Sequence, residues 1–156
     1  MALFAVFRRW YMPEEHKIRY GWLKAMYIYT IIGAGGFGLG IIVMPTYMRM
    51  IFNWPEQDPI VYWVMGIVYL SFGLLSILGL KAPLKFATFL LLQLTYKVVW
   101  FIVVVAPILF TGNFQAYAIL HVVIFLTYII GDLIAIPFSY VFDKEAGQSN
   151  SLHPVT

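Results

Sequence analysis

Cysteine is absent from this 156-residue chain, and histidine is scarce. Without thiols the chain has no disulfides, iron–sulfur clusters, thiolate zinc sites or thiol-based redox catalysis. Of its three histidines, only His121 lies within a long apolar stretch. A histidine-rich metal site and a haem with two axial histidines from one chain are therefore not expected. No other catalytic signature is present, so the sequence predicts no catalytic residues and no metal.

Charge is the second shortage. Only 11% of the residues are charged, 62% are hydrophobic, and the mean hydropathy is +0.85. Soluble domains carry about 25% charged residues. The chain therefore belongs in lipid, with no room for a soluble domain of useful size. Its net charge of +3 reflects basic residues that flank apolar stretches, so we expect contact with the lipid bilayer and no nucleic-acid binding.

Four stretches approach or exceed the length of about 20 apolar residues that crosses the hydrocarbon core. They are residues 23–44, 60–80, 86–109 and 116–138. The connectors after the second and third stretches are short, which forces neighbouring helices to run antiparallel. The sequence therefore predicts an all-α fold, a four-helix transmembrane bundle with a short N-terminal interfacial helix.

The two ends of the chain differ in composition from the bundle, which we place at residues 23–140. Residues 1–22 form a predicted cytoplasmic interfacial segment. Within it, residues 1–12 suit a helix lying in the interface, with aromatic side chains at headgroup level. Residues 141–156 form a polar C-terminal tail.

Basic residues gather on one side of the predicted bundle. They are Arg8, Arg9, Lys17, Arg19, Lys24, Lys81, Lys85 and Lys144. The other side carries only Arg49, beside Glu56 and Asp58. The positive-inside rule therefore predicts that both termini are cytoplasmic. The connector 45–59 then lies outside, where its aromatic residues favour a position on the membrane surface; a lid over an outward-facing cavity is the alternative.

Two charged residues, Lys97 and Asp132, lie deep inside predicted spans. A charge at the bilayer centre costs roughly 2.5 to 3.5 kcal/mol, so it usually has a partner or a function. Lys97 lies about 18 Å along its helix from Lys85, and Asp132 about 16 Å from Asp143, so the two can meet at one level. Such a pair, with Gln93 one turn away, either fixes helix register or forms a polar pocket for a headgroup, quinone or proton. The sequence leaves both readings open.

Helical spacing extends this pair into two facing stripes on spans three and four. The resulting candidate ligand-binding residues are Lys97, Asp132, Gln93, Tyr96, Trp100, Tyr128 and His121. His121 lies near the end of its span, where a simple interfacial histidine is the plainer interpretation.

Span one contains the glycine-rich run GAGGFGLG at residues 33–40. It matches a dinucleotide-binding pattern literally, but no strand precedes it, so we reject that reading. Gly36 and Gly40 also form a GxxxG pair, which allows close helix approach. Gly66 and Gly73 in span two could supply the complementary surface. Packing within the bundle is favoured over homodimerisation.

Four features together resemble the DoxX-like family of small four-helix bacterial membrane proteins. These are Pro45, the run from Gly66 to Gly79, TYKVVWF at 95–101, and GDLIAIPF at 131–138. The resemblance covers about residues 23–140. It implies a multi-pass protein of the bacterial cytoplasmic (inner) membrane. Some family members resemble subunits of quinone-linked oxidoreductases or accessory membrane components, and no catalytic residues carry over.

These observations favour a non-enzymatic accessory or structural subunit that packs into a larger membrane assembly or binds lipid. A membrane-protein partner is expected. The first alternative is a quinone-binding subunit of an oxidoreductase with a polar site between spans three and four. The second is a small transporter. No cofactor is predicted, although a bound quinone or lipid fits the candidate site.

Overall fold

The computed structural model describes residues 18–112 and 114–142. The predicted interfacial helix over residues 1–12 and the tail from residue 143 lie outside these ranges. The chain divides into two units, and the bundle is the one from Tyr20 to Ile136. The short helix α9 (Phe138–Phe142) belongs to the other unit.

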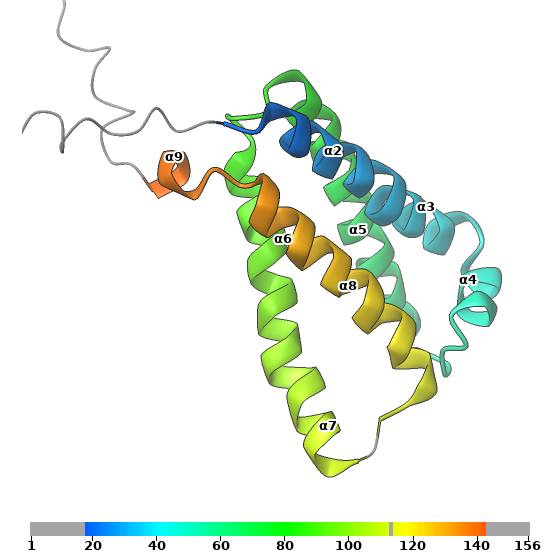
Figure 1. Cartoon of the computed structure of the whole chain (residues 1–156). Helices are drawn as coiled ribbons and strands as arrows, with labels where there is room; N and C mark the ends of the chain where they lie inside the picture. The colour runs from blue at the N-terminus through cyan, green and yellow to red at the C-terminus, as the bar shows by residue number, and fades with distance from the viewer. Residues whose placement is uncertain (1–17, 113, 143–156) are drawn as a thin grey trace, which may run out of the picture. The chain divides into compact units, whose positions relative to one another are not determined.

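The bundle contains four helical spans among the described residues, each long and apolar enough to cross a membrane (Figure 1). They run from Tyr20 to Val43, Pro59 to Lys81, Ala87 to Thr111 and Ala116 to Ala135. Span two is α5 (Pro59–Lys81), span four is α8 (Ala116–Ala135), and α4 (Pro45–Ile51) follows span one. The predicted all-α, four-helix transmembrane architecture is confirmed, and the chain is a multi-pass membrane protein.

Spans one and three each contain a π-helical turn. Span one consists of α2 (Tyr20–Thr30), η1 (Ile31–Gly35) and α3 (Gly36–Val43). Span three consists of α6 (Ala87–Trp100), η2 (Phe101–Val105) and α7 (Ala106–Thr111). Pro107 lies two residues after the end of η2, and it lacks the backbone N–H that an α-helical hydrogen bond would need. The π turn, which contains one more residue than an α-helical turn, therefore lies next to the proline.

The helix boundaries follow from local chemistry. Asp58 caps α5, because its side chain accepts hydrogen bonds from the N–H groups of Ile60 at 2.9 Å and Val61 at 3.1 Å. At the other end of the bundle, α8 stops at Ala135, three residues before the predicted end of span four. Ile136 is extended there (φ −69°, ψ 122°), as expected for a residue that precedes a proline.

Two packed pairs of spans make up the bundle. Helix α5 packs along α2, η1 and α3, while α8 packs against both α6 and α2. In Figure 1, α4 lies at the same end of the bundle as the start of α8. We call this the α4 end, and the opposite one, where α5 ends, the Lys81 end.

Glycines join α5 to span one at van der Waals distance. A methyl group on Gly35 would lie 3.1 Å from the Cα of Gly73, and one on Gly38 would overlap the backbone of Leu70. The expected packing of Gly66 and Gly73 against span one is therefore present. The working pair in span one is Gly35 and Gly38, however, because Gly36 faces open space. A three-residue spacing thus replaces the expected GxxxG contact.

Candidate functional site

A buried hydrogen-bond chain runs from span three to span one. The Lys97 ammonium donates to Gln93 Oε1 at 3.1 Å, and Gln93 Nε2 donates to Thr30 Oγ1 at 3.3 Å. Thr30 Oγ1 in turn donates to the backbone carbonyl of Met26 at 2.9 Å. Thr30 and Gln93 are fully buried, and Lys97 is 1% exposed. The lysine is therefore anchored inside the bundle, where it is shielded from acyl chains.

Aromatic rings complete the surroundings of Lys97. Its Nζ lies 4.4 Å from the ring centre of Tyr96 and 4.3 Å from that of Tyr128. At these distances the negative faces of the two rings attract the ammonium. The remaining polar contact is the Gln93 carbonyl, at 3.4 Å. Only one residue therefore supplies the oxygen acceptors that Lys97 uses in the described part of the chain.

The predicted direct ion pair between Lys97 and Asp132 is not formed. Across the described ranges, the only ion pair is the one between Arg49 and Glu56 near the α4 end. The physical reason is that Gln93 and the two tyrosine rings already hold the ammonium. Asp132 lies in the last turn of α8, about one helical turn beyond Tyr128, whose ring the ammonium contacts.

Asp132 is fully buried, and neither carboxylate oxygen has a hydrogen-bond partner among the described residues. The same holds for the hydroxyl oxygen of Ser76 on α5. A buried carboxylate without hydrogen bonds is expensive. The nearby positive charge of Lys97 is the compensation that the structure offers.

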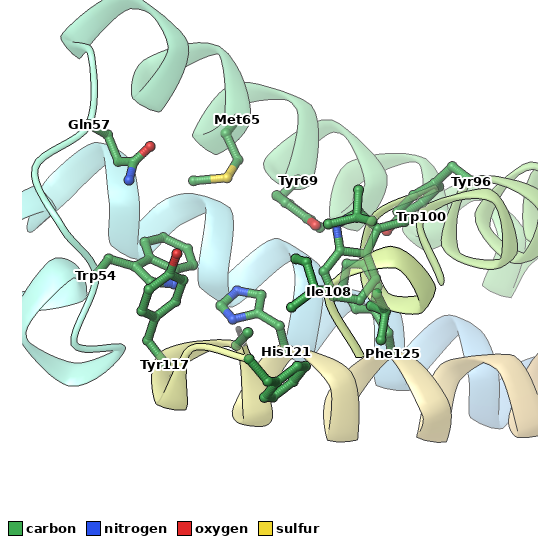
Figure 2. A pocket seen from close by; sticks show the side chains of 14 residues that line it. Trp54, Gln57, Met65, Tyr69, Tyr96, Trp100, Ile108, Tyr117, His121 and Phe125 are labelled. Atoms are coloured by element: carbon green, nitrogen blue, oxygen red, sulfur yellow. The ribbon is translucent and has the colours of Figure 1, made fainter. Parts of the chain in front are cut away.

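A cavity of about 450 Å³ lies between α5, span three and α8 toward the α4 end (Figure 2). We call it the outer cavity. Nine of its lining residues are apolar: Trp54, Met65, Trp100, Val104, Val105, Ile108, Phe114, Ala118 and Phe125. Five carry a polar group: Gln57, Tyr69, Tyr96, Tyr117 and His121. An apolar wall with a few polar groups is the usual composition of a small-molecule site.

A second, smaller cavity of about 180 Å³ adjoins the first, and we call it the inner cavity. Four residues line both cavities: Tyr69, Tyr96, His121 and Phe125. The inner cavity also reaches Lys97 and Tyr128, and Gly33 and Ala34 of the π turn η1. The two cavities together therefore lead from the α4 end toward the buried ammonium.

The connector after α4 covers this region with aromatic side chains. Trp54 stacks on His121, with ring centres 4.8 Å apart and planes inclined by 29°, and Phe52 lies 5.3 Å from the same ring. Phe37 of α3 packs edge-on against both Phe52 and Trp54. Among the two interpretations of this connector, the structure favours a cover over a cavity.

Most predicted site residues line these cavities. Tyr96, Trp100 and His121 line the outer cavity, and Lys97, Tyr96, Tyr128 and His121 line the inner one. Gln93 and Asp132 line neither. His121 is thus part of the cavity wall and of an aromatic cluster (Figure 2). Sequence reasoning missed Tyr69, because no pattern indicated that α5 contributes to the space between spans three and four. It also missed Phe125, although this residue lies on α8 between His121 and Tyr128 at helical spacing.

Comparisons with protein families, curated proteins and solved structures found no match. The resemblance to the DoxX-like family therefore stays a prediction. The fold and the site define a class: a multi-pass, four-helix membrane protein with an aromatic cavity inside the bundle.

Proposed function

We propose that this protein binds an apolar, membrane-soluble ligand of the lipid class inside its bundle. The observation that carries the proposal is the outer cavity. Its volume of about 450 Å³ falls within the range of roughly 300 to 1,000 Å³ found for small-molecule sites.

The chemistry of the wall supports a ligand with a flat or branched apolar body. Trp100 and Phe125 pack edge to face, with ring centres 4.9 Å apart, and present large apolar surfaces. Indole and phenyl surfaces contribute much of the binding energy of such ligands through buried area. The hydroxyl of Tyr69 and the imidazole of His121 add hydrogen-bonding groups that could orient a polar substituent.

A cavity-filling variant tests the proposal. Ala118 lines the outer cavity, so Ala118→Trp should fill part of it. The neighbouring Ile119 is 53% exposed, and Ile119→Trp is the matched control. Organic extracts of the purified proteins, analysed by mass spectrometry, should contain one molecule at near-equal amounts in wild type and control. Its amount should fall about tenfold in Ala118→Trp.

Two results would contradict the proposal. One is a wild-type protein that retains no molecule at a stoichiometric level. The other is an Ala118→Trp protein that folds, judged by circular dichroism, and retains as much ligand as the control.

The other functions expected from the sequence are a quinone-binding subunit and an accessory subunit. A quinone ligand would use Tyr96 and Trp100, as expected, but Asp132 does not line either cavity, so a proton relay through it is not part of this proposal. An accessory role with a membrane-protein partner stays a prediction. The exposed apolar surface of the spans fits a protein partner and lipid equally well.

A further inference from the structure

We propose that the inner cavity receives a neutral six-membered ring whose oxygen acceptor binds Lys97, while an apolar substituent of that ring extends into the outer cavity. This inference rests on the proposed ligand-binding function and names the chemical class of the ligand.

The size of the inner cavity points to a single ring. An apolar cavity of about 150 Å³ engineered into another protein binds benzene. The inner cavity measures about 180 Å³ and is walled by the rings of Tyr29, Tyr96, Phe125 and Tyr128. Aromatic rings pack well against such walls in offset or edge-on arrangements. A ring therefore fills this space better than a flexible acyl chain, which would lose more conformational entropy on binding.

Lys97 points to an oxygen acceptor on that ring. An ammonium has three N–H donors, and within the described ranges both of its acceptors belong to Gln93. One donor is therefore left without an oxygen acceptor in the described part of the chain, where the rings of Tyr96 and Tyr128 are its neighbours. Because Lys97 lines the inner cavity and is 1% exposed, a carbonyl or hydroxyl oxygen of a ligand could accept from it in a water-poor environment, where a charge-assisted hydrogen bond is strong.

The local charge favours a neutral ligand over an anion. Lys97 carries the positive charge of the site, and Asp132 is fully buried about one helical turn beyond Tyr128, whose ring the Lys97 ammonium contacts. The two formal charges cancel. A ligand carboxylate would add a negative charge to a buried region that already contains one, and this repulsion weakens binding.

The continuity of the two cavities places the substituent. Tyr69, Tyr96, His121 and Phe125 form a shared wall, so a chain attached to the ring can pass from the inner into the outer cavity. There it meets apolar side chains such as Val105 and Ile108.

Three probes with alkyl chains of nearly equal length separate the components of this proposal. Decylbenzoquinone has the ring and the oxygen acceptors, decylbenzene has the ring alone, and decanoate has an anionic head without a ring. Isothermal titration calorimetry on the full-length protein in detergent measures each affinity. Decylbenzoquinone should bind at least tenfold more tightly than either of the other two.

Substitution of Lys97 tests the oxygen contact. Lys97→Met should weaken decylbenzoquinone binding about tenfold, the usual contribution of one hydrogen bond to a charged group, and leave decylbenzene binding unchanged. Lys85→Met is the matched control, because Lys85 is exposed and lies outside both cavities.

A second variant keeps the test decisive if Lys97→Met does not fold. Ile124 lines the inner cavity, so Ile124→Phe should reduce ring binding, whereas Leu126→Phe, at an exposed position, should not. The proposal is overturned if decanoate binds most tightly, if no probe binds, or if Lys97→Met and Ile124→Phe both retain wild-type affinity. In each case, ligand retention that depends on Ala118 would still support the outer-cavity function by itself.

Discussion

The electrostatic relation between Lys97 and Asp132 makes a quantitative prediction about folding stability. The perturbation is a double-mutant cycle of Lys97→Met, Asp132→Asn and the two together. Both residues are buried, and the structure shows no direct ion pair between them. The separation of the two charges therefore exceeds that of a direct ion pair. As a general guide, Coulomb's law gives an attraction of about 2 to 3 kcal/mol for opposite charges about 5 to 8 Å apart at an effective dielectric constant of about 20.

Each single substitution should therefore leave one buried charge without its compensating neighbour and lower the free energy of unfolding. The double variant removes both charges, so its loss should be about 2 kcal/mol smaller than the sum of the two single losses. Denaturant-induced unfolding in a defined detergent, followed by circular dichroism, measures all four proteins. Lys85→Met, at an exposed site, controls for the general effect of removing a lysine.

Additive losses, equal to the sum of the single effects within about 0.5 kcal/mol, would refute this reasoning. They would mean that Lys97 is stabilised by Gln93 and the tyrosine rings alone. The Asp132 carboxyl group would then have no stabilising electrostatic interaction with the Lys97 ammonium.

Two further predictions concern the fold. Gly38→Ala should destabilise the bundle by about 1 to 3 kcal/mol, because the added methyl group would overlap the backbone of Leu70. Gly36→Ala, which meets open space, should not destabilise it in the same unfolding assay, and equal losses would show that the two glycines are equivalent. Asp58→Ala should lower thermal stability by about 1 kcal/mol through loss of the N-cap of α5. Asp58→Asn, which keeps an acceptor oxygen, should stay near wild type; an Asn variant as unstable as the Ala variant would contradict capping.

The spans could be predicted from the sequence because their signal is composition and length. The end of α8 was predicted less accurately, at residue 138 instead of Ala135, although Pro137 is present in the sequence. Apolar residues continue to Phe138, so the prediction based on hydropathy extended the span to that residue. It did not take into account that a proline disfavours the helical conformation in the residue before it. The predicted interfacial helix over residues 1–12 and the part of the predicted polar tail from residue 143 lie outside the described ranges.

The burial of Lys97 and Asp132 also follows from sequence, since lipid exposure of either charge is costly. Their partners did not follow. Depth along a helix can be counted from residue numbers. Whether the Lys97 ammonium contacts Asp132 or Gln93, however, depends on side-chain rotamers. The two tyrosine rings that flank it come from different helices. Sequence spacing alone does not contain that information.

The position of the cavity has a physical explanation in the distribution of small residues. Gly35 and Gly38 let α5 approach span one closely, and α6 packs separately along α8. Between these two pairs the facing side chains are large: Tyr69 on α5, Tyr96 and Trp100 on α6, and Phe125 on α8. These bulky rings cannot approach as closely as the glycines do, and the two cavities lie among them.

Both π turns contribute residues to the walls of the cavities. Gly33 and Ala34 of η1 line the inner cavity, and Val104 and Val105 of η2 line the outer one. Single π turns in α-helices occur frequently at functional sites, because the inserted residue changes the direction of the side chains that follow it. In this bundle, residues of both π turns line the same connected internal space. The coincidence of both π turns with the cavities supports our proposal that the cavities bind a ligand.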